Sequence, residues 1–111
     1  MRQIAAMTPH QDGPVAGDVA PGSDDPDANS QALKALAHHL GADMVGVCRV
    51  PDYAWYSHQA DGTEIEPYHR YAVVMLLDQG YETMEGASGD DWVSGAQSMR
   101  AYMRGAQIAG V

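Results

Sequence analysis

The sequence predicts a small α/β unit whose elements follow in the order helix, strand, loop, strand, helix. Three observations support this prediction: a helical apolar repeat at residues 26–40, two short apolar runs, and a long amphipathic segment near the end of the chain. A helix that leads directly into an apolar strand is typical of α/β folds. Because 111 residues, 45% of them hydrophobic, can build one modest core, we expect at most one domain.

The first 24 residues differ in composition from the rest of the chain. The stretch Gly13 to Gly22 contains five glycines and prolines, few large apolar side chains and no periodicity. We therefore expect residues 1–24 to form a disordered or extended N-terminal arm, and residues 25–111 to form the ordered unit.

The first helix is expected at residues 26–40. Asp25 can cap its first turn, Pro26 suits the first helical position, and Gly41 stands where a left-handed C-terminal cap is favoured. Apolar residues also recur at the spacing of one helical face: Leu33, Leu36, Ala37 and Leu40. This face should pack on the core.

Two apolar runs, Met44 to Val50 and Tyr71 to Leu77, predict short strands that are covered on both faces. The single cysteine, Cys48, lies in the first run, so we expect a buried and unreactive thiol. Without a second cysteine, the chain cannot form an internal disulfide.

The segment between the strands predicts an irregular excursion. Asp61-Gly62 is a strong turn signal that suits a small hairpin, and Pro67 interrupts any regular element. This region and its neighbours are also rich in aromatic residues, which could form the wall of a pocket for a planar ligand or belong to a core without phenylalanine. These residues are Tyr53, Trp55, Tyr56, Tyr68, Tyr71 and Tyr81.

The last segment predicts a helix that starts at Asp90 or Asp91 and continues to the final residue without a stop signal. We therefore expect the chain to be a piece of a longer protein. The expected core-facing stripe is Trp92, Ala96, Met99, Met103, Ala106 and Gly110. A second, narrow stripe, which a backbone or a flat ligand could approach closely, is Ser98, Tyr102, Gly105 and Ala109.

The charge and hydropathy of the chain argue against several classes of partner. A net charge of −9, from 15 acidic and 6 basic side chains, would repel a phosphate backbone, so we expect no nucleic acid partner. We also expect no membrane association, because no apolar run of about 18 residues is present. The N-terminus lacks a signal core, which favours a cytoplasmic location.

Short chemical motifs do not identify a site. The adjacent histidines His38 and His39 would point roughly 100° apart on a helix and cannot chelate one metal together. The glycines near residues 80–95 match neither phosphate-binding loop motif, and the acidic side chains around them would repel phosphate. Solvation and helix capping are the simpler interpretation of those carboxylates.

Longer stretches give a family resemblance. The segments LKALAHHLGADMVGVCRVPDYAWYSH, YAVVMLLDQGYETMEGASGDDW and SGAQSMRAYMRGAQIAG, in this order, resemble the cobalamin-dependent reductive dehalogenases. The likeness is greatest to the non-exported, oxygen-tolerant branch of that family, and it covers about residues 31–111. The specificity rests on the combination of these segments, because no single one would suffice.

The resemblance implies the N-terminal part of a cobalamin-binding domain, an α/β fold related to nitroreductases. It implies an enzyme that removes halide from an organohalide with reduced cobalamin. Electrons would arrive through two iron–sulfur clusters from a reductase or a ferredoxin. Candidate neighbours of the cobalamin or the substrate in the matched loop and helix are Tyr81, Ser98, Met99 and Tyr102, which we expect to bind the cofactor.

The chain also departs from the complete family pattern. It has only Cys48, whereas iron–sulfur clusters need several cysteine ligands, so the clusters are expected beyond Val111. The catalytic residues are expected there too, and we assign none in this chain, which alone should be inactive. Two alternatives stay open, namely a small non-catalytic cobalamin carrier and a scaffold module of a larger enzyme.

Overall fold

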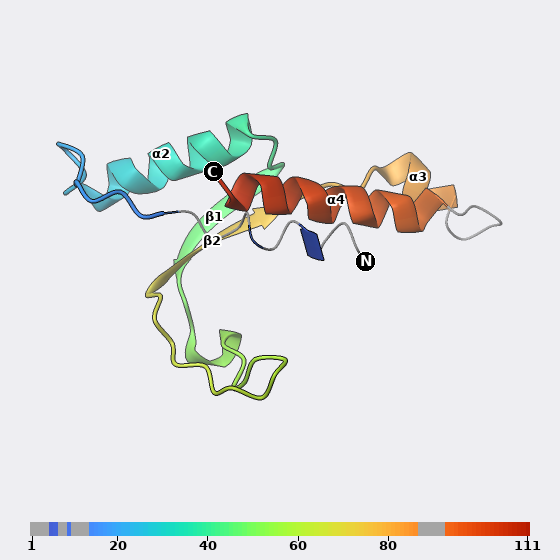
Figure 1. The fold of residues 1–111 in the computed structure, drawn as a ribbon. Helices are drawn as coiled ribbons and strands as arrows, with labels where there is room; N and C mark the ends of the chain where they lie inside the picture. Colours follow the sequence, from blue (N-terminus) through green and yellow to red (C-terminus); the bar gives the residue numbers. More distant parts are fainter. Residues whose placement is uncertain (1–4, 7–8, 10–13, 87–92) are drawn as a thin grey trace.

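The computed structural model describes residues 5–6, 9, 14–86 and 93–111 (Figure 1). It contains the elements α2 (Pro26–His39), β1 (Met44–Arg49), β2 (Tyr71–Leu76) and α4 (Val93–Ala109). Two short helices, η2 (Asp52–Ala54) and α3 (Tyr81–Glu85), lie between them. The predicted order of helix, strand, loop, strand and helix is therefore confirmed.

Local signals at both ends define α2. The Asp25 carboxylate accepts hydrogen bonds from the backbone N–H groups of Asp27, at 2.9 Å, and Ala28, at 3.2 Å. Pro26 occupies the first turn, and Gly41 has a φ of 105°, a conformation that side chains with a Cβ rarely adopt. The predicted caps and bounds are thus confirmed to within one residue.

The segment before α2 contains turns and bends between residues 14 and 24, and its valines Val15 and Val19 are almost fully exposed. A turn closes where the Ser23 N–H donates to the Ala20 carbonyl oxygen at 3.2 Å. The division of the chain into an N-terminal arm at residues 1–24 and a domain at residues 25–111 stays a prediction.

The two strands form one antiparallel sheet in which Met44 lies opposite Leu76 and Arg49 lies opposite Tyr71. Residues that lie opposite each other share a face, so Val45 and Met75 point to the same side. That side packs on the core formed with the two long helices: Ala37 and Ala42, Ile108 of α4, and around them Leu40, Val45, Met75 and Leu77.

The second face of the sheet is exposed. Met44 is 63% exposed, Val74 51% and Leu76 58%, and the Cys48 thiol on this face is exposed as well. The predictions of strands covered on both faces and of a buried thiol are therefore wrong for this chain. The runs look like buried strands because both faces are apolar, yet the described residues cover only one of them.

The chain is open for its size. Its accessible surface is 9235 Å², whereas a compact monomer of this mass exposes about 5,900 Å². Its radius of gyration is 16.9 Å, compared with about 13 Å for a compact domain of this length. Figure 1 shows the reason, because residues 50–70 project from the strands and lie away from the helices. We call residues 50–70 the arm. Much apolar surface is thus available for further packing.

The tip of this arm is a small hairpin, as the turn signal predicts. The Gln59 N–H donates to the Thr63 carbonyl oxygen at 2.8 Å, and the Ile65 N–H donates to the Ser57 carbonyl oxygen at 3.0 Å. At the turn, the Asp61 carboxylate accepts a hydrogen bond from the Thr63 N–H at 2.9 Å. This bond favours the ionised form and lowers the pKa of Asp61.

We expect this pKa shift to make the hairpin sensitive to acid. Because the pKa of Asp61 is lower in the folded turn than in the unfolded chain, its stabilising effect is present above the unfolded value and is lost as pH falls through the folded value. An NMR titration of the Asp61 carboxyl carbon should show the lowered pKa. In Thr63→Val, which keeps the backbone N–H, most of the lowering should remain. A pKa at or above the ordinary value would contradict the turn geometry.

The side of α4 that packs on the core agrees only in part with the predicted stripe. Its buried residues are Ala101, Ala106 and Ile108, so the prediction is confirmed at Ala106, whereas the predicted core residues Ala96 and Gly110 are exposed. The cause is the close approach at Gly105, where an added Cβ would lie 3.0 Å from the Leu77 side chain. The predicted starts Asp90 and Asp91 and the core candidate Trp92 lie outside the described residues.

The ends of the last two helices also correct the sequence analysis. The helix α4 ends at Ala109, two residues before the end predicted from the pattern, and the Val111 N–H donates to the Ile108 carbonyl oxygen at 3.3 Å. The stretch Tyr81–Glu85, expected to be part of a loop, is the short helix α3. It follows Gly80, whose φ of 85° turns the chain out of the strand.

Candidate functional site

An open groove lies between the end of β2 and α4. Its volume is about 390 Å³. It is lined by Met75, Leu76, Leu77, Gln79, Ala101, Tyr102, Gly105 and Ala106. The floor on the helix side consists of small residues, so the α4 backbone lies close to the strand, and the walls are mostly apolar. Only Gln79 and Tyr102 bring polar side-chain atoms to this lining, a composition typical of small-molecule sites.

The Gln79 side chain is held by α4. The Ser98 hydroxyl donates to the Gln79 Oε1 atom at 3.2 Å, and both side chains are half-buried. Ser98 lies one helical turn before Tyr102, so the helix presents the two hydroxyl groups on one side of its surface. The groove therefore has a polar end, where the turn after β2 meets this helix.

A set of polar contacts, which we call the brace, fixes the turn after β2. The Arg104 guanidinium donates to the Gly41 carbonyl oxygen and lies 3.8 Å from the Asp43 carboxylate. Asp43 in turn accepts a hydrogen bond from the Asp78 N–H at 2.7 Å, and the Asp78 carboxylate accepts one from the Gly80 N–H at 2.9 Å. The brace thus links α2, β1, the turn after β2 and α4.

A second polar contact joins α3 to α4. The Gln97 Nε2 atom donates to the Thr83 hydroxyl at 2.8 Å, and that hydroxyl donates to the Gly80 carbonyl oxygen at 3.0 Å. Gly80 is tightly placed, because an added Cβ would lie 3.0 Å from the Thr83 hydroxyl and its φ is positive. The two helices are therefore tied together beside the polar end of the groove.

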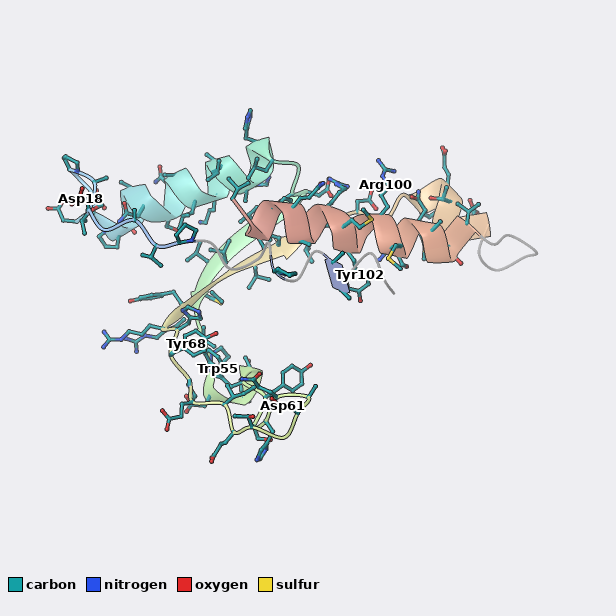
Figure 2. The ribbon with its side chains drawn as sticks, viewed as in Figure 1. Asp18, Trp55, Asp61, Tyr68, Arg100 and Tyr102 are labelled. Atoms are coloured by element: carbon teal, nitrogen blue, oxygen red, sulfur yellow. The ribbon has the colours of Figure 1, made fainter. Side chains whose placement is uncertain are left out.

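The structure brings two of the four predicted site residues together. Ser98 contacts Gln79 at the polar end of the groove, and Tyr102, which is 65% exposed, lines the groove itself. Tyr81, 77% exposed, lines an adjoining hollow on α3. Met99 lies on a different side of α4, next to Arg100. Figure 2 shows Arg100 and Tyr102 on opposite sides of this helix. Their roles as cobalamin neighbours stay predictions.

Gln79 is a residue that the sequence analysis missed. Its position after an apolar strand, between Asp78 and the turn residue Gly80, is a weak local signal for a polar group at a strand end. No short motif marks it. Its partner Ser98 lies 19 residues further along the chain, so only the fold brings the two together.

The aromatic residues form a separate cluster on the arm. The Trp55 and Tyr68 rings lie 5.4 Å apart, and the Tyr68 and His69 rings lie 4.2 Å apart (Figure 2). Tyr53 and Tyr56 are 90% and 82% exposed, so the interpretation that these tyrosines replace phenylalanine in the core is wrong. None of the arm residues lines the groove beside α4.

The described part of the chain contains neither a metal-binding cluster nor a membrane-spanning helix. No group of three or more histidine, cysteine, aspartate or glutamate side chains among them could hold a metal ion. In the same part of the chain, the helices are too short or too polar to cross a membrane.

Comparisons with known proteins give a clear relationship. Neither a scan against protein-family models nor a search of curated proteins found a match. Among solved structures, the catabolic reductive dehalogenase NpRdhA in complex with 3-bromo-4-hydroxybenzoic acid matches with a TM-score of 0.84 and 56% identity. A reductive dehalogenase structure described as suggesting a mechanism for B12-dependent dehalogenation matches with a TM-score of 0.82 and 56% identity. A variant of NpRdhA matches with a TM-score of 0.79 and 55% identity.

Each of these matches covers 96% of this chain and 16% of the solved protein. The chain thus spans about one sixth of the length of these relatives, and it aligns with them almost completely. Identity above one half over nearly every residue is far beyond a likeness of fold alone. The chain therefore belongs to the reductive dehalogenase family and corresponds to one segment of its longer members.

Proposed function

We propose that this chain is the segment of a reductive dehalogenase that supplies one wall of its cobalamin-binding domain. The observation that supports this most directly is the 56% identity to a reductive dehalogenase whose structure is described as suggesting a mechanism for B12-dependent dehalogenation. We also propose that the complete domain has the nitroreductase-like fold that the sequence resemblance implies, and that the enzyme acts in the cytoplasm. The exposed sheet face would then pack against the remainder of the enzyme.

The groove beside α4 suits the edge of a corrin ring. A corrin is flat and largely apolar, and its rim carries amide side chains that need hydrogen-bonding partners. The small residues Ala101 and Gly105 leave room for a flat surface, Tyr102 offers an aromatic wall, and Gln79 offers an amide. Tyr81 and Ser98 would adjoin the same edge, and Met99 would face away from it.

The iron–sulfur clusters do not fit this segment. A cubane cluster is held by four cysteine thiolates, and the chain contains one cysteine, Cys48. We therefore propose that the cluster ligands and the catalytic groups belong to other parts of the enzyme. When bound, reduced cobalamin supplies the electrons that break the carbon–halogen bond of an organohalide, so that halide leaves and the carbon takes up a proton. A reductase or ferredoxin would renew these electrons.

Halide release by the full-length protein that contains this segment tests the proposal. We expect the cobalamin-loaded protein to release bromide from 3-bromo-4-hydroxybenzoic acid, the compound bound by the relative, when a low-potential reductant is supplied. The chain of residues 1–111 alone should release none, because it lacks cluster ligands. Full-length protein that binds cobalamin without releasing halide from this or other aryl halides would favour the carrier interpretation.

The role of the groove is tested by measuring the cobalamin affinity of a variant in its lining. Tyr102→Ala should weaken cobalamin binding about 5- to 30-fold, because it removes an aromatic wall worth about 1–2 kcal/mol. Tyr53→Ala is the matched control, since Tyr53 is 90% exposed on the arm and should leave binding unchanged. Equal affinities of both variants and wild type would favour the scaffold interpretation, in which this segment serves only packing.

A further inference from the structure

The amide of Gln79 accepts a hydrogen bond but donates none among the described contacts. Its Oε1 atom accepts the hydrogen bond from Ser98, and no hydrogen bond found among the described residues uses its Nε2 atom. The neighbouring glutamine of α4 differs, because Gln97 donates from Nε2 to Thr83 at 2.8 Å. An N–H group in a mostly apolar groove gains stability from an acceptor, so the site favours a ligand with one.

The donor is also fixed in position before any ligand binds. Ser98 sets the orientation of the amide, because a hydroxyl that donates to Oε1 directs the Nε2 group away from itself. The brace holds the backbone on both sides of Gln79, through the Asp78 N–H and the Gly80 N–H. A preorganised donor loses little conformational entropy on binding.

We propose that Gln79 is a ligand-binding residue whose Nε2 group donates a hydrogen bond to the carbonyl oxygen of an amide on the rim of a corrinoid. This inference rests on the proposed function and adds the chemistry of one contact. Tyr102 lies in the same lining and covers the apolar part of the ligand, while Gln79 forms a hydrogen bond with its polar rim. Ser98 acts as a positioning residue, because its hydroxyl orients the Gln79 amide.

The test compares two glutamines that undergo the same change of charge. Gln79→Glu keeps the oxygen that accepts from Ser98 but removes the donor at neutral pH. Gln107→Glu is the control, because Gln107 is exposed on another side of α4, beside Arg100. Each variant of the full-length protein is freed of cobalamin and titrated with hydroxocobalamin, and the Kd and the melting temperature of the cobalamin-free form are measured.

We expect Gln79→Glu to raise the Kd about three- to tenfold, the effect of one hydrogen bond, with Gln107→Glu within about twofold of wild type. Gln79→Met, which has no donor and no charge, should raise the Kd similarly. An unchanged Kd for both Gln79 variants would overturn the inference, while wild-type protein that binds no corrinoid would instead refute the proposed function. A lowered melting temperature of the cobalamin-free Gln79 variants with an unchanged Kd would overturn it too, since the amide would then bond to protein.

Discussion

Ile108→Ala is expected to lower the free energy needed to open α4 from the sheet by about 2–4 kcal/mol, the usual cost of emptying a buried isoleucine site. Ile108 is 8% exposed and packs with Ala37 and Ala42. All other buried residues of the described chain are alanines. A large share of the buried apolar volume at this contact therefore belongs to one side chain, and the small alanines around it cannot expand to fill the cavity.

Hydrogen exchange in the intact protein that contains this segment measures this effect locally. The amides of β1 and of the last turns of α4 should exchange about 30- to 1000-fold faster in Ile108→Ala, as the expected loss of free energy dictates. Val111→Ala is the control, because Val111 is close in sequence but 81% exposed. Protection equal to wild type at these amides would show that the core does not depend on this contact.

Arg104→Met is expected to lower the free energy needed to open α4 from the sheet by about 1–2 kcal/mol. The guanidinium donates a charge-assisted hydrogen bond to the Gly41 carbonyl oxygen and pairs with Asp43. The Arg104 and Asp43 side chains are 31% and 46% exposed, so water screens the ion pair and it contributes little. Most of the lost stability should come from the hydrogen bond to the Gly41 carbonyl oxygen. In the described contacts, no backbone N–H group donates to this oxygen.

Two further variants separate these contributions. Arg104→Lys keeps the charge near Asp43 but lacks the planar fork, so it should restore only a small part of the stability. Arg100→Ala, an exposed arginine one turn earlier on α4, should have almost no effect. The loss in Arg104→Met should also persist in about 1 M salt, where surface ion pairs are screened. If salt abolishes the difference between Arg104→Met and wild type, the ion pair rather than the hydrogen bond is the important contact.

The elements with local signals are those that the sequence predicts well. Asp25, Pro26 and Gly41 act within one or two turns of α2, so its caps and bounds follow from the chain itself. The Asp61 hairpin is equally local, because its hydrogen bonds join residues two to eight positions apart. The family resemblance, now confirmed, depends on longer segments and gives the order of the elements.

The features that the sequence does not predict depend on distant partners. The α4 helix has alanine, methionine or glycine on several sides, so its pattern fits more than one core-facing stripe, and the contact of Gly105 with Leu77 decides between them. The short helix α3 is tied down by Gln97, which lies 14 residues beyond its partner Thr83. Gln79 also depends on distant partners, because Ser98 and the brace fix its position only in the folded chain.

The arm has a consequence for the order in which the sheet folds. β1 and β2 pair across residues 50–70, and closing so long a connection costs more conformational entropy than closing a tight turn. The hairpin at Asp61 shortens the effective connection, and hairpins of this kind form in about 1–10 μs. We therefore expect the tip of the arm to close first and Arg49 and Tyr71 to meet next. Pairing should then proceed toward Met44 and Leu76, beside the groove.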